Sequence, residues 1–189
     1  MFKRISNPIF NELIDINLIN KKNLKIISKK TRDKKMNVYQ DQKSRIILLQ
    51  KYYKNNFYKN QNVNSKKFFD DDLRRYNKFK NLIGDKILLD FGCGWGGFLS
   101  KFKNKENKFG VEVRKECIKY INDNFKFKVF NKLSQISLKF DYITLFHVLE
   151  HIPNQIIILK KIKKKLKKNG VVIIEVPHAK DFLIETLNL

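Results

Sequence analysis

The sequence predicts an α/β fold, a Rossmann-like parallel sheet with helices on both faces. From residue 85 onward, short apolar runs alternate with segments whose apolar residues recur at helical spacing. The runs at 87–91 and 171–176 are almost continuously apolar, which is typical of strands buried on both faces. A glycine-rich loop follows the first of these runs. Together these three features indicate an open sheet with a ligand at the carboxyl ends of its strands.

Residues 66–189 are expected to form this Rossmann-like domain. Its helices are predicted at 68–83, 97–102, 116–125 and 154–168, and its strands at 87–91, 108–113, 127–130, 140–146 and 171–176. Gly84 is expected to end the first helix, and Asn169-Gly170 the last one.

Residues 1–65 are expected to be a small N-terminal extension. A short strand is predicted at 24–27, and a β-hairpin from 38–40 and 45–49 around the polar segment 41–44. The polar, aromatic and Asn-rich stretch at 51–67 is predicted to be a loop or lid.

Charge is the most conspicuous feature of the composition. The 189 residues include 41 Lys and Arg against 18 Asp and Glu, a net charge of +23. Because the excess is spread over both halves, it favours a general bias in composition, and the lysines of the last helix are expected to form a solvated face. A nucleic acid or an anionic surface stays open as a partner but is not favoured.

The remaining composition favours a cytoplasmic protein without a membrane span. No run approaches the roughly 20 apolar residues that a bilayer requires. The N-terminus has no apolar signal-peptide core, and the two cysteines cannot build a disulfide framework.

The glycine loop and a downstream acid predict a nucleoside-containing cofactor. Gly92 and Gly94 follow a predicted strand and allow close approach of a ligand to the backbone. Glu112 ends the next strand, 20 residues after Gly92, where a carboxylate can accept hydrogen bonds from ribose hydroxyls. With Gly97, the loop also fits the dinucleotide pattern G-x-G-x-x-G. Asp90, two residues before the first glycine, would oppose a pyrophosphate and favours a cationic cofactor instead.

Four segments in this order resemble class I S-adenosylmethionine-dependent methyltransferases. They are the glycine loop at 89–96, the acidic strand end at 110–112, the strand and following turn at 140–152, and the segment at 166–177. The branch they resemble most contains the ubiquinone-type O-methyltransferases and sugar methyltransferases.

The resemblance implies S-adenosylmethionine as cofactor and a role for each matching residue. Asp90 would neutralise the amino group of the cofactor, and Glu112 would hold its ribose. The remaining cofactor-site residues are Gly92 and Gly94 beside the methionine part, Asn131 beside the adenine, and Phe146 and His147 beside the methionine and the sulfonium.

The segment H-x-x-E-H supplies the candidates for acid–base chemistry. His147 and His151 are the candidate catalytic residues, with a structural role at the strand end as the alternative for His151. The resemblance implies E-x-x-E-H and a divalent metal here in ubiquinone-type enzymes, so Glu150 and His151 are weak metal candidates and no metal is predicted. His178 would face the acceptor or lie in a surface loop.

The expected function is methyl transfer to a small-molecule acceptor, such as a sugar or a quinone-like phenol. Three alternatives stay open: an RNA methyltransferase, a non-catalytic accessory or cofactor-binding fragment, and a nicotinamide oxidoreductase. The resemblance implies a sheet of seven strands, so the domain is expected to be truncated after the fifth. Alternatively, a partner completes the sheet edge, or N-terminal strands cover it.

Overall fold

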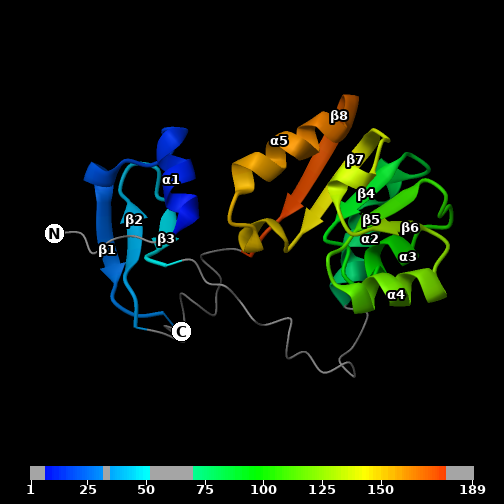
Figure 1. Ribbon diagram of the computed structural model, residues 1–189, viewed down its shortest axis with the longest axis horizontal. Coiled ribbons are helices and arrows are strands. Elements are labelled where there is room, and N and C mark those ends of the chain that lie inside the picture. Colours follow the sequence, from blue (N-terminus) through cyan, green and yellow to red (C-terminus); the bar gives the residue numbers. More distant parts are fainter. Residues whose placement is uncertain (1–6, 32–34, 52–69, 178–189) are drawn as a thin grey trace. The chain divides into compact units, whose positions relative to one another are not determined.

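The computed structural model describes residues 7–31, 35–51 and 70–177 (Figure 1). These residues divide into two compact units. One contains the N-terminal helix and a three-stranded sheet, and residues 152–158 group with it. The other contains the five-stranded sheet and its helices.

The N-terminal unit is a short helix with an antiparallel sheet of order β1-β2-β3. Its elements are α1 (Pro8–Asp15), η1 (Lys21–Asn23), β1 (Leu24–Ser28), β2 (Val38–Asp41) and β3 (Ile47–Leu49). The strand and the hairpin predicted from the sequence are present, and β2 pairs with β3. Helix α1 was not predicted, although Asn7 caps its N-terminus and Pro8 stands at its first position, a usual start signal.

A buried aspartate fixes the hairpin turn of this unit. Asp41 is 1% exposed and accepts backbone hydrogen bonds from Asn20, Lys43 and Ser44 at 2.8–2.9 Å. The bonds from Asn20 and Ser44 lower the pKa of Asp41, so the carboxylate stays charged while it holds the turn.

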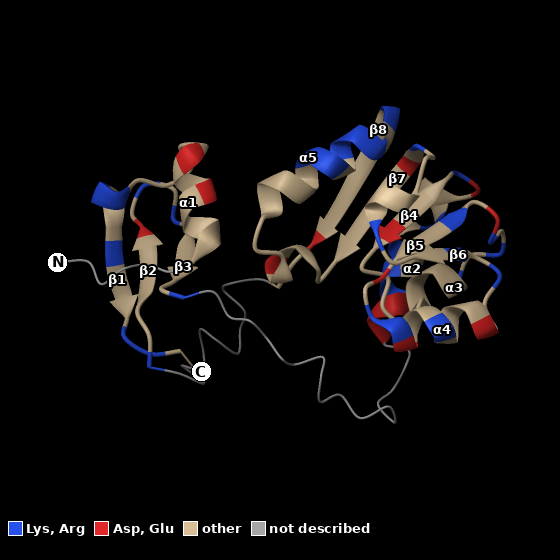
Figure 2. Ribbon diagram, viewed as in Figure 1, with Lys and Arg blue, Asp and Glu red and all other residues tan. Residues whose placement is uncertain are grey.

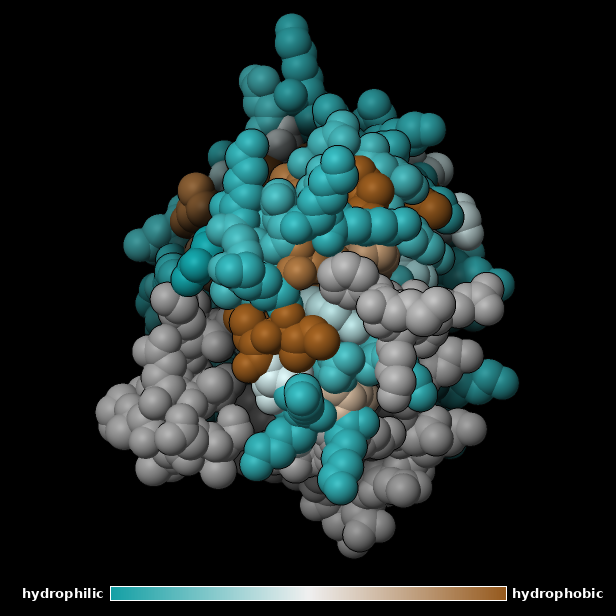
Figure 3. Space-filling model, turned by 90° about the vertical axis from the view of Figure 1, so that its left-hand side faces the viewer, coloured by the Kyte–Doolittle hydropathy of each residue, from teal (hydrophilic) through white to brown (hydrophobic). Residues whose placement is uncertain are grey.

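The core of the N-terminal unit is small. It comprises Phe10, Ile19, Leu24, Tyr39 and Leu48. A single helix can cover only one face of a three-stranded sheet. Other apolar side chains of this unit therefore stay exposed, among them Ile16, Leu18, Ile26, Ile27 and Ile47. The space-filling view shows exposed apolar side chains among hydrophilic ones (Figure 3).

The second unit is a fully parallel sheet of order β6-β5-β4-β7-β8, as expected for the Rossmann-like class. Its helices are α2 (Asp70–Ile83), α3 (Gly97–Ser100), α4 (Lys115–Asn124) and α5 (Gln155–Lys165), and its strands are β4 (Leu88–Phe91), β5 (Lys108–Val111), β6 (Lys128–Phe130), β7 (Phe140–Phe146) and β8 (Leu166–Glu175). Two short 3₁₀ turns are η3 (Leu133–Gln135) and η4 (Leu149–His151).

The order of the strands places helices on both faces of this sheet (Figure 1). From β4 the chain moves outward through β5 and β6, and from β7 it moves the other way to β8. Since parallel crossovers are right-handed, helices of the two halves lie on opposite faces. The core cluster of the first face joins α2, α3 and α4 to the sheet through Ile83, Leu88, Phe98, Leu99, Phe102, Ile121, Tyr142 and Phe146.

The second face of the sheet is also buried, because successive side chains of the central strands point to opposite faces. Leu89 and Ile143, which alternate with the members of the first cluster, are completely buried, and so is Ile162 of α5. Complete burial of a Leu or Ile side chain contributes about 1.5–3 kcal/mol, so both faces stabilise the strands that carry the site.

The junction of α5 and β8 differs from the prediction. Helix α5 ends at Lys165, not at 168, and Asn169-Gly170 lie inside β8. Leu166 already pairs with Phe140, and the next pair is Val171 with Tyr142, so five residue steps of β8 pass two of β7. A Cβ on Gly170 would lie 2.8 Å from the Phe140 carbonyl oxygen. The glycine therefore permits a bulge against β7 rather than a helix end.

Two further expectations concern the ends of elements. Gly84 ends α2 as predicted, with a φ of +47° and its amide bonded to the Lys80 carbonyl. The predicted loop or lid at 51–67 lies almost entirely outside the described residues. Among the residues that are described, no helix is both long enough and apolar enough to cross a membrane.

Candidate functional site

The site begins at the loop that leaves the carboxyl end of β4. Gly92 has a φ of +81° and Gly94 a φ of +56°, both in the left-handed region that favours glycine. The amides of Gly92 and Cys93 donate to the Val111 carbonyl at 2.7 and 3.1 Å, which ties the loop to the end of β5. A Cβ on Gly92 would meet Val148 at 2.3 Å, whereas one on Gly94 would meet only the Arg114 guanidinium, at 3.5 Å. The two glycines therefore differ: packing demands Gly92, while the space at Gly94 is open.

Glu112 lies directly after β5 and holds the glycine loop from the other side. Its carboxylate is 6% exposed and accepts the Gly94 amide on Oε2 at 2.9 Å. Oε1 accepts the amides of Val113 and Arg114 at 2.9 and 3.0 Å, and the Arg114 Nε at 3.3 Å. A carboxylate offers about four lone-pair sites, so Oε2 retains acceptor capacity toward a ligand in the loop.

Asp90 lies at the end of β4 and is 4% exposed. Its Oδ1 accepts a hydrogen bond from the Thr144 hydroxyl of β7 at 2.7 Å. Burial raises the pKa of Asp90 to about 7, although the Thr144 bond works in the opposite direction. Asp72 and Glu112 raise the pKa further, while Arg75 lowers it. The positive charge near Asp90 is thus too small to keep the buried carboxyl fully ionised at neutral pH. A bound ammonium or sulfonium group would stabilise the ionised form.

A cluster of charged side chains lies beside this loop, at the carboxyl end of β8. The Glu175 Oε1 accepts hydrogen bonds from Arg74 Nη2 at 2.9 Å and from Arg75 Nε and Nη2 at 2.9 and 2.6 Å. Burial would raise the pKa of Glu175, but the two arginines outweigh it and lower the pKa to about 2. Glu175 therefore fixes the first turns of α2 to the end of β8.

His147 belongs to the same cluster. Its Nε2 lies 3.2 Å from Oε1 of Glu175, and its Nδ1 lies 3.5 Å from Oε1 of Glu150. The residue has a φ of +52°, uncommon for a side chain with a Cβ, and its amide donates to the Glu175 carbonyl. The imidazole is 41% exposed, and its Nε2 is the ring nitrogen closer to a carboxylate. A neutral ring with its proton on Nε2 leaves Nδ1 to accept a proton.

His151 is farther from this network. Its Nε2 lies 3.9 Å from Oε1 of Glu150, and its side chain is 42% exposed. Oε2 of Glu150 is buried and accepts no hydrogen bond within the described residues. No group of three or more His, Cys, Asp or Glu side chains in 7–31, 35–51 and 70–177 is arranged to hold a metal ion.

Two predicted site residues lie elsewhere than at the loop. Phe146 is 9% exposed and packs in the aromatic core, stacked on Phe79 and edge-to-face with Phe98, with the Arg75 guanidinium 5.0 Å from its ring centroid. Asn131 is exposed after β6, and its amide donates to Gln135 Oε1 at 3.2 Å. The structure thus brings Asp90, the two glycines and Glu112 together around one loop. It puts His147 in the neighbouring ion cluster, and His178 lies outside the described residues.

Sequence reasoning missed three members of the site. Arg75 and Glu175 are 100 residues apart. The sequence around Arg75 does not show that this arginine, among the basic residues of its helix, pairs with the end of a distant strand. Thr144 is hidden inside an apolar strand. For Glu175 a signal existed, since it ends a run of four apolar residues and therefore had to lie at the ligand edge of a parallel sheet.

Comparisons with known proteins show which family this chain resembles. The family model described as "Methyltransferase domain" matches residues 48–188. A ubiquinone biosynthesis O-methyltransferase of Actinobacillus pleuropneumoniae serotype 7 (strain AP76) is 33% identical over 110 residues, which cover 50% of this chain and 46% of that protein. The chain therefore spans about half the length of the curated relative it matches.

Solved structures were also similar to this chain. A SAM-dependent methyltransferase of Thermotoga maritima, described as a possible histamine N-methyltransferase, shares the fold, with a TM-score of 0.51 at 22% identity over 62% of this chain and 56% of that one. Coclaurine N-methyltransferase, solved with N-methylheliamine and SAH, has a TM-score of 0.49 at 20% identity, over 61% of this chain and 38% of that one.

Proposed function

The chain belongs to the methyltransferase domain family, and we propose that it transfers a methyl group from S-adenosylmethionine to a small-molecule acceptor. The observation that carries the proposal is the loop at 92–94, whose Gly94 amide donates to the buried Glu112 and which follows the buried Asp90 of β4. The relative that acts in ubiquinone biosynthesis supports a phenolic, quinone-like acceptor, and a sugar is the other candidate.

The residues present fit this cofactor. Asp90 is buried with its pKa raised to about 7, so its ionised form requires a nearby cation, which the amino and sulfonium groups would provide. The open space at Gly94 leaves room for a ligand against the backbone, and Oε2 of Glu112 can accept a ribose hydroxyl. A pyrophosphate would instead meet two carboxyl groups here, which disfavours a nicotinamide dinucleotide.

The cofactor, when bound, supplies an activated methyl group. The protein then has to orient the acceptor in line with it and exclude water, and such positioning contributes up to about 7–11 kcal/mol in well-oriented models. A hydroxyl acceptor must also lose its proton. We assign the removal of this proton to Nδ1 of His147, with the ring proton on Nε2 facing Glu175, in preference to the more distant His151.

Calorimetric titration of the chain with S-adenosylhomocysteine tests the cofactor site. We expect saturable binding, no binding of NAD, and a loss of more than about 1.5 kcal/mol for Glu112→Ala because charged hydrogen bonds disappear. Lys119→Ala, an exposed change on α4, is the matched control. No heat with S-adenosylhomocysteine, or undiminished binding by Glu112→Ala, would contradict the proposal.

A turnover assay tests the acceptor. Release of S-adenosylhomocysteine in the presence of simple catechols or of sugars would identify the acceptor class. Binding of the cofactor without turnover on either class would instead favour an accessory, cofactor-binding role. His147→Gln is expected to lower turnover on a hydroxyl acceptor about 10²–10⁴-fold while cofactor binding stays intact.

A further inference from the structure

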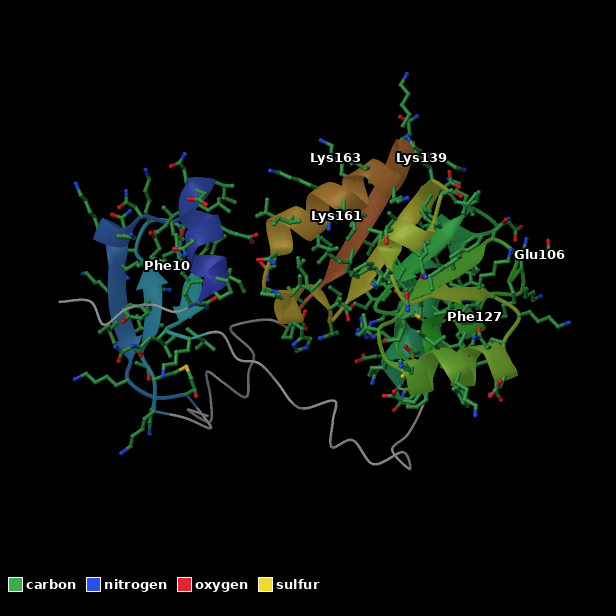
Figure 4. All side chains as sticks on the ribbon, in the orientation of Figure 1. Phe10, Glu106, Phe127, Lys139, Lys161 and Lys163 are labelled. Atoms are coloured by element: carbon green, nitrogen blue, oxygen red, sulfur yellow. The ribbon has the colours of Figure 1, made fainter. Side chains whose placement is uncertain are left out.

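The opposite end of the five-stranded sheet carries a dense group of lysines. Between His151 and Ile174 the sequence contains seven lysines and no Asp or Glu. We define the lysine patch as seven exposed lysines from α5, the bulge of β8 and the turns before β4 and β7: Lys86, Lys139, Lys160, Lys161, Lys163, Lys164 and Lys168. Figure 2 shows the second half of α5 and the start of β8 largely in the colour of basic residues, and Figure 4 labels Lys139, Lys161 and Lys163.

Contacts within the fold bring these segments together. Leu166 pairs with Phe140, which places the turn of Lys139 beside the end of α5, and Lys165 donates to the Ile136 carbonyl from the same side. A hollow of about 330 Å³ lies between Lys86 and Lys168 at the start of β7. Its other lining residues are Asp141, Tyr142, Lys167 and Asn169. The Asp141 carboxylate accepts a hydrogen bond from Lys167 at 2.9 Å, so its charge is already balanced.

The patch is unfavourable for the isolated helix. At about 100° per residue, Lys160, Lys161, Lys163 and Lys164 share one half of α5, and lysines three or four apart on a helix repel each other. A solvated helical face usually relieves this with glutamates at the same spacing, and α5 has none. A bound polyanion would remove the repulsion.

We propose that the lysine patch is a docking surface for the phosphate backbone of a nucleic acid. Lysine ammonium groups are point charges without fixed geometry, which suits a repeating row of phosphates better than one small ligand. The hollow between Lys86 and Lys168 is lined mainly by polar and charged residues and is large enough for a phosphate group. A membrane fits less well, because between Lys160 and Asn169 the apolar residues are Ile162, which is buried, and Leu166, which is half-buried.

The patch is separate from the methyltransferase site. Strand β7 runs from Phe140, beside the patch, to Phe146, beside His147, and six residue steps of a strand span about 20 Å. A nucleic acid on the patch therefore leaves the glycine loop accessible, and docking there does not depend on the proposed methyl transfer.

Fluorescence anisotropy with a labelled single-stranded RNA tests the surface across a range of KCl concentrations. If about four lysines contact phosphates, the logarithm of the association constant should fall with the logarithm of salt with a slope near −3. We expect the triple variant Lys161→Glu, Lys164→Glu, Lys168→Glu to lose at least about tenfold in affinity and to show a slope near −1. The same three positions changed to Gln should lose less affinity than the Glu variant, because the positive charges are removed without adding negative ones. This milder variant checks that the loss does not come from misfolding.

A control variant separates the patch from net charge. Lys119→Glu, Lys126→Glu and Lys128→Glu change three exposed lysines around α4 and β6 and lower the net charge equally. This control should keep wild-type RNA affinity within about twofold. Equal loss in both triple variants, no salt-dependent RNA binding, or binding only to vesicles of anionic lipid would each overturn the proposal.

Discussion

The two ends of the five-stranded sheet treat charge in opposite ways. At the carboxyl ends of the strands, Asp90 and Glu112 are 4% and 6% exposed, and each accepts hydrogen bonds of defined geometry. At the amino ends, the lysine patch is exposed and consists of one kind of charge. Buried, directional contacts select one ligand, whereas exposed point charges attract any polyanion in a salt-dependent way. The net charge of +23 and the enzyme-like site are therefore separate properties of the molecule.

The sharpest test of the carboxyl end is Gly94→Val. We expect it to lower S-adenosylhomocysteine affinity more than about 100-fold, because a side chain would occupy the space where the ligand approaches the loop. Gly84→Val is the matched control, since Gly84 also has a positive φ but a Cβ added there would have nothing within 4 Å, and it lies outside the loop. Both changes strain the backbone by about 1–2 kcal/mol. Equal affinity in the two variants, measured by calorimetry, would show that the ligand does not approach the backbone at Gly94.

The second test uses the buried Asp90. Because its pKa in the folded protein is raised from 3.8 to about 7, the folded state holds a proton that the unfolded state has lost between these values. Its contribution to stability is therefore present below about pH 4 and is lost as the pH rises toward 7, at up to about 1.4 kcal/mol per pH unit. Asp90→Asn should remove this part of the slope in urea unfolding measured at several pH values. An unchanged slope would show that Asp90 is not buried as a neutral acid.

The third test breaks the ion cluster at Glu175. Glu175→Gln leaves Arg75, which is 8% exposed, with only the Asp71 carboxylate at 3.9 Å as a charged partner, and we expect a loss of about 1–2 kcal/mol in the free energy of unfolding. In the wild type this contribution is present above about pH 4.5 and is lost as the pH falls toward 2, since the pKa of Glu175 is lowered to about 2. Asp71→Asn, at a carboxylate whose side chain is 53% exposed, should cost less than about 0.5 kcal/mol. Similar losses of unfolding free energy in Glu175→Gln and Asp71→Asn would mean that burial of the Glu175 ion pairs adds nothing to their contribution to stability.

The smallest effect is expected at the amino end. Lys160→Glu replaces repulsion from Lys163 and Lys164 with attraction, and should raise the free energy of unfolding by about 0.5 kcal/mol. Lys160→Gln removes only the repulsion and should gain about half as much. A loss of stability in both variants, measured by urea unfolding, would show that Lys160 has a structural role and would weaken the contrast between the two ends.

Short-range patterns in the sequence accounted for most of the architecture. Strand β7 was predicted with its observed bounds, and the other four strands of the sheet were predicted within a few residues, except the start of β8. The exception is instructive, because Asn169-Gly170 is a good helix stop, and only its pairing with β7 turns it into a bulge. Helix α1 was missed although a start signal, Asn7-Pro8, precedes it and Ile9, Phe10, Leu13 and Ile14 recur at helical spacing. It spans only eight residues, so its pattern covers about two turns.

By itself, the sequence determined the order of the elements, the glycine loop and the position of Glu112, because periodicity, turn residues and the spacing of a loop to the next strand are local properties. Only the tertiary structure decided that Arg75, His147 and Glu175 form one cluster, that Thr144 meets Asp90, and that lysines from four segments share one end of the sheet. The physical reason is that ion pairs and burial depend on distances between residues far apart in the chain, and only the packed fold fixes those distances.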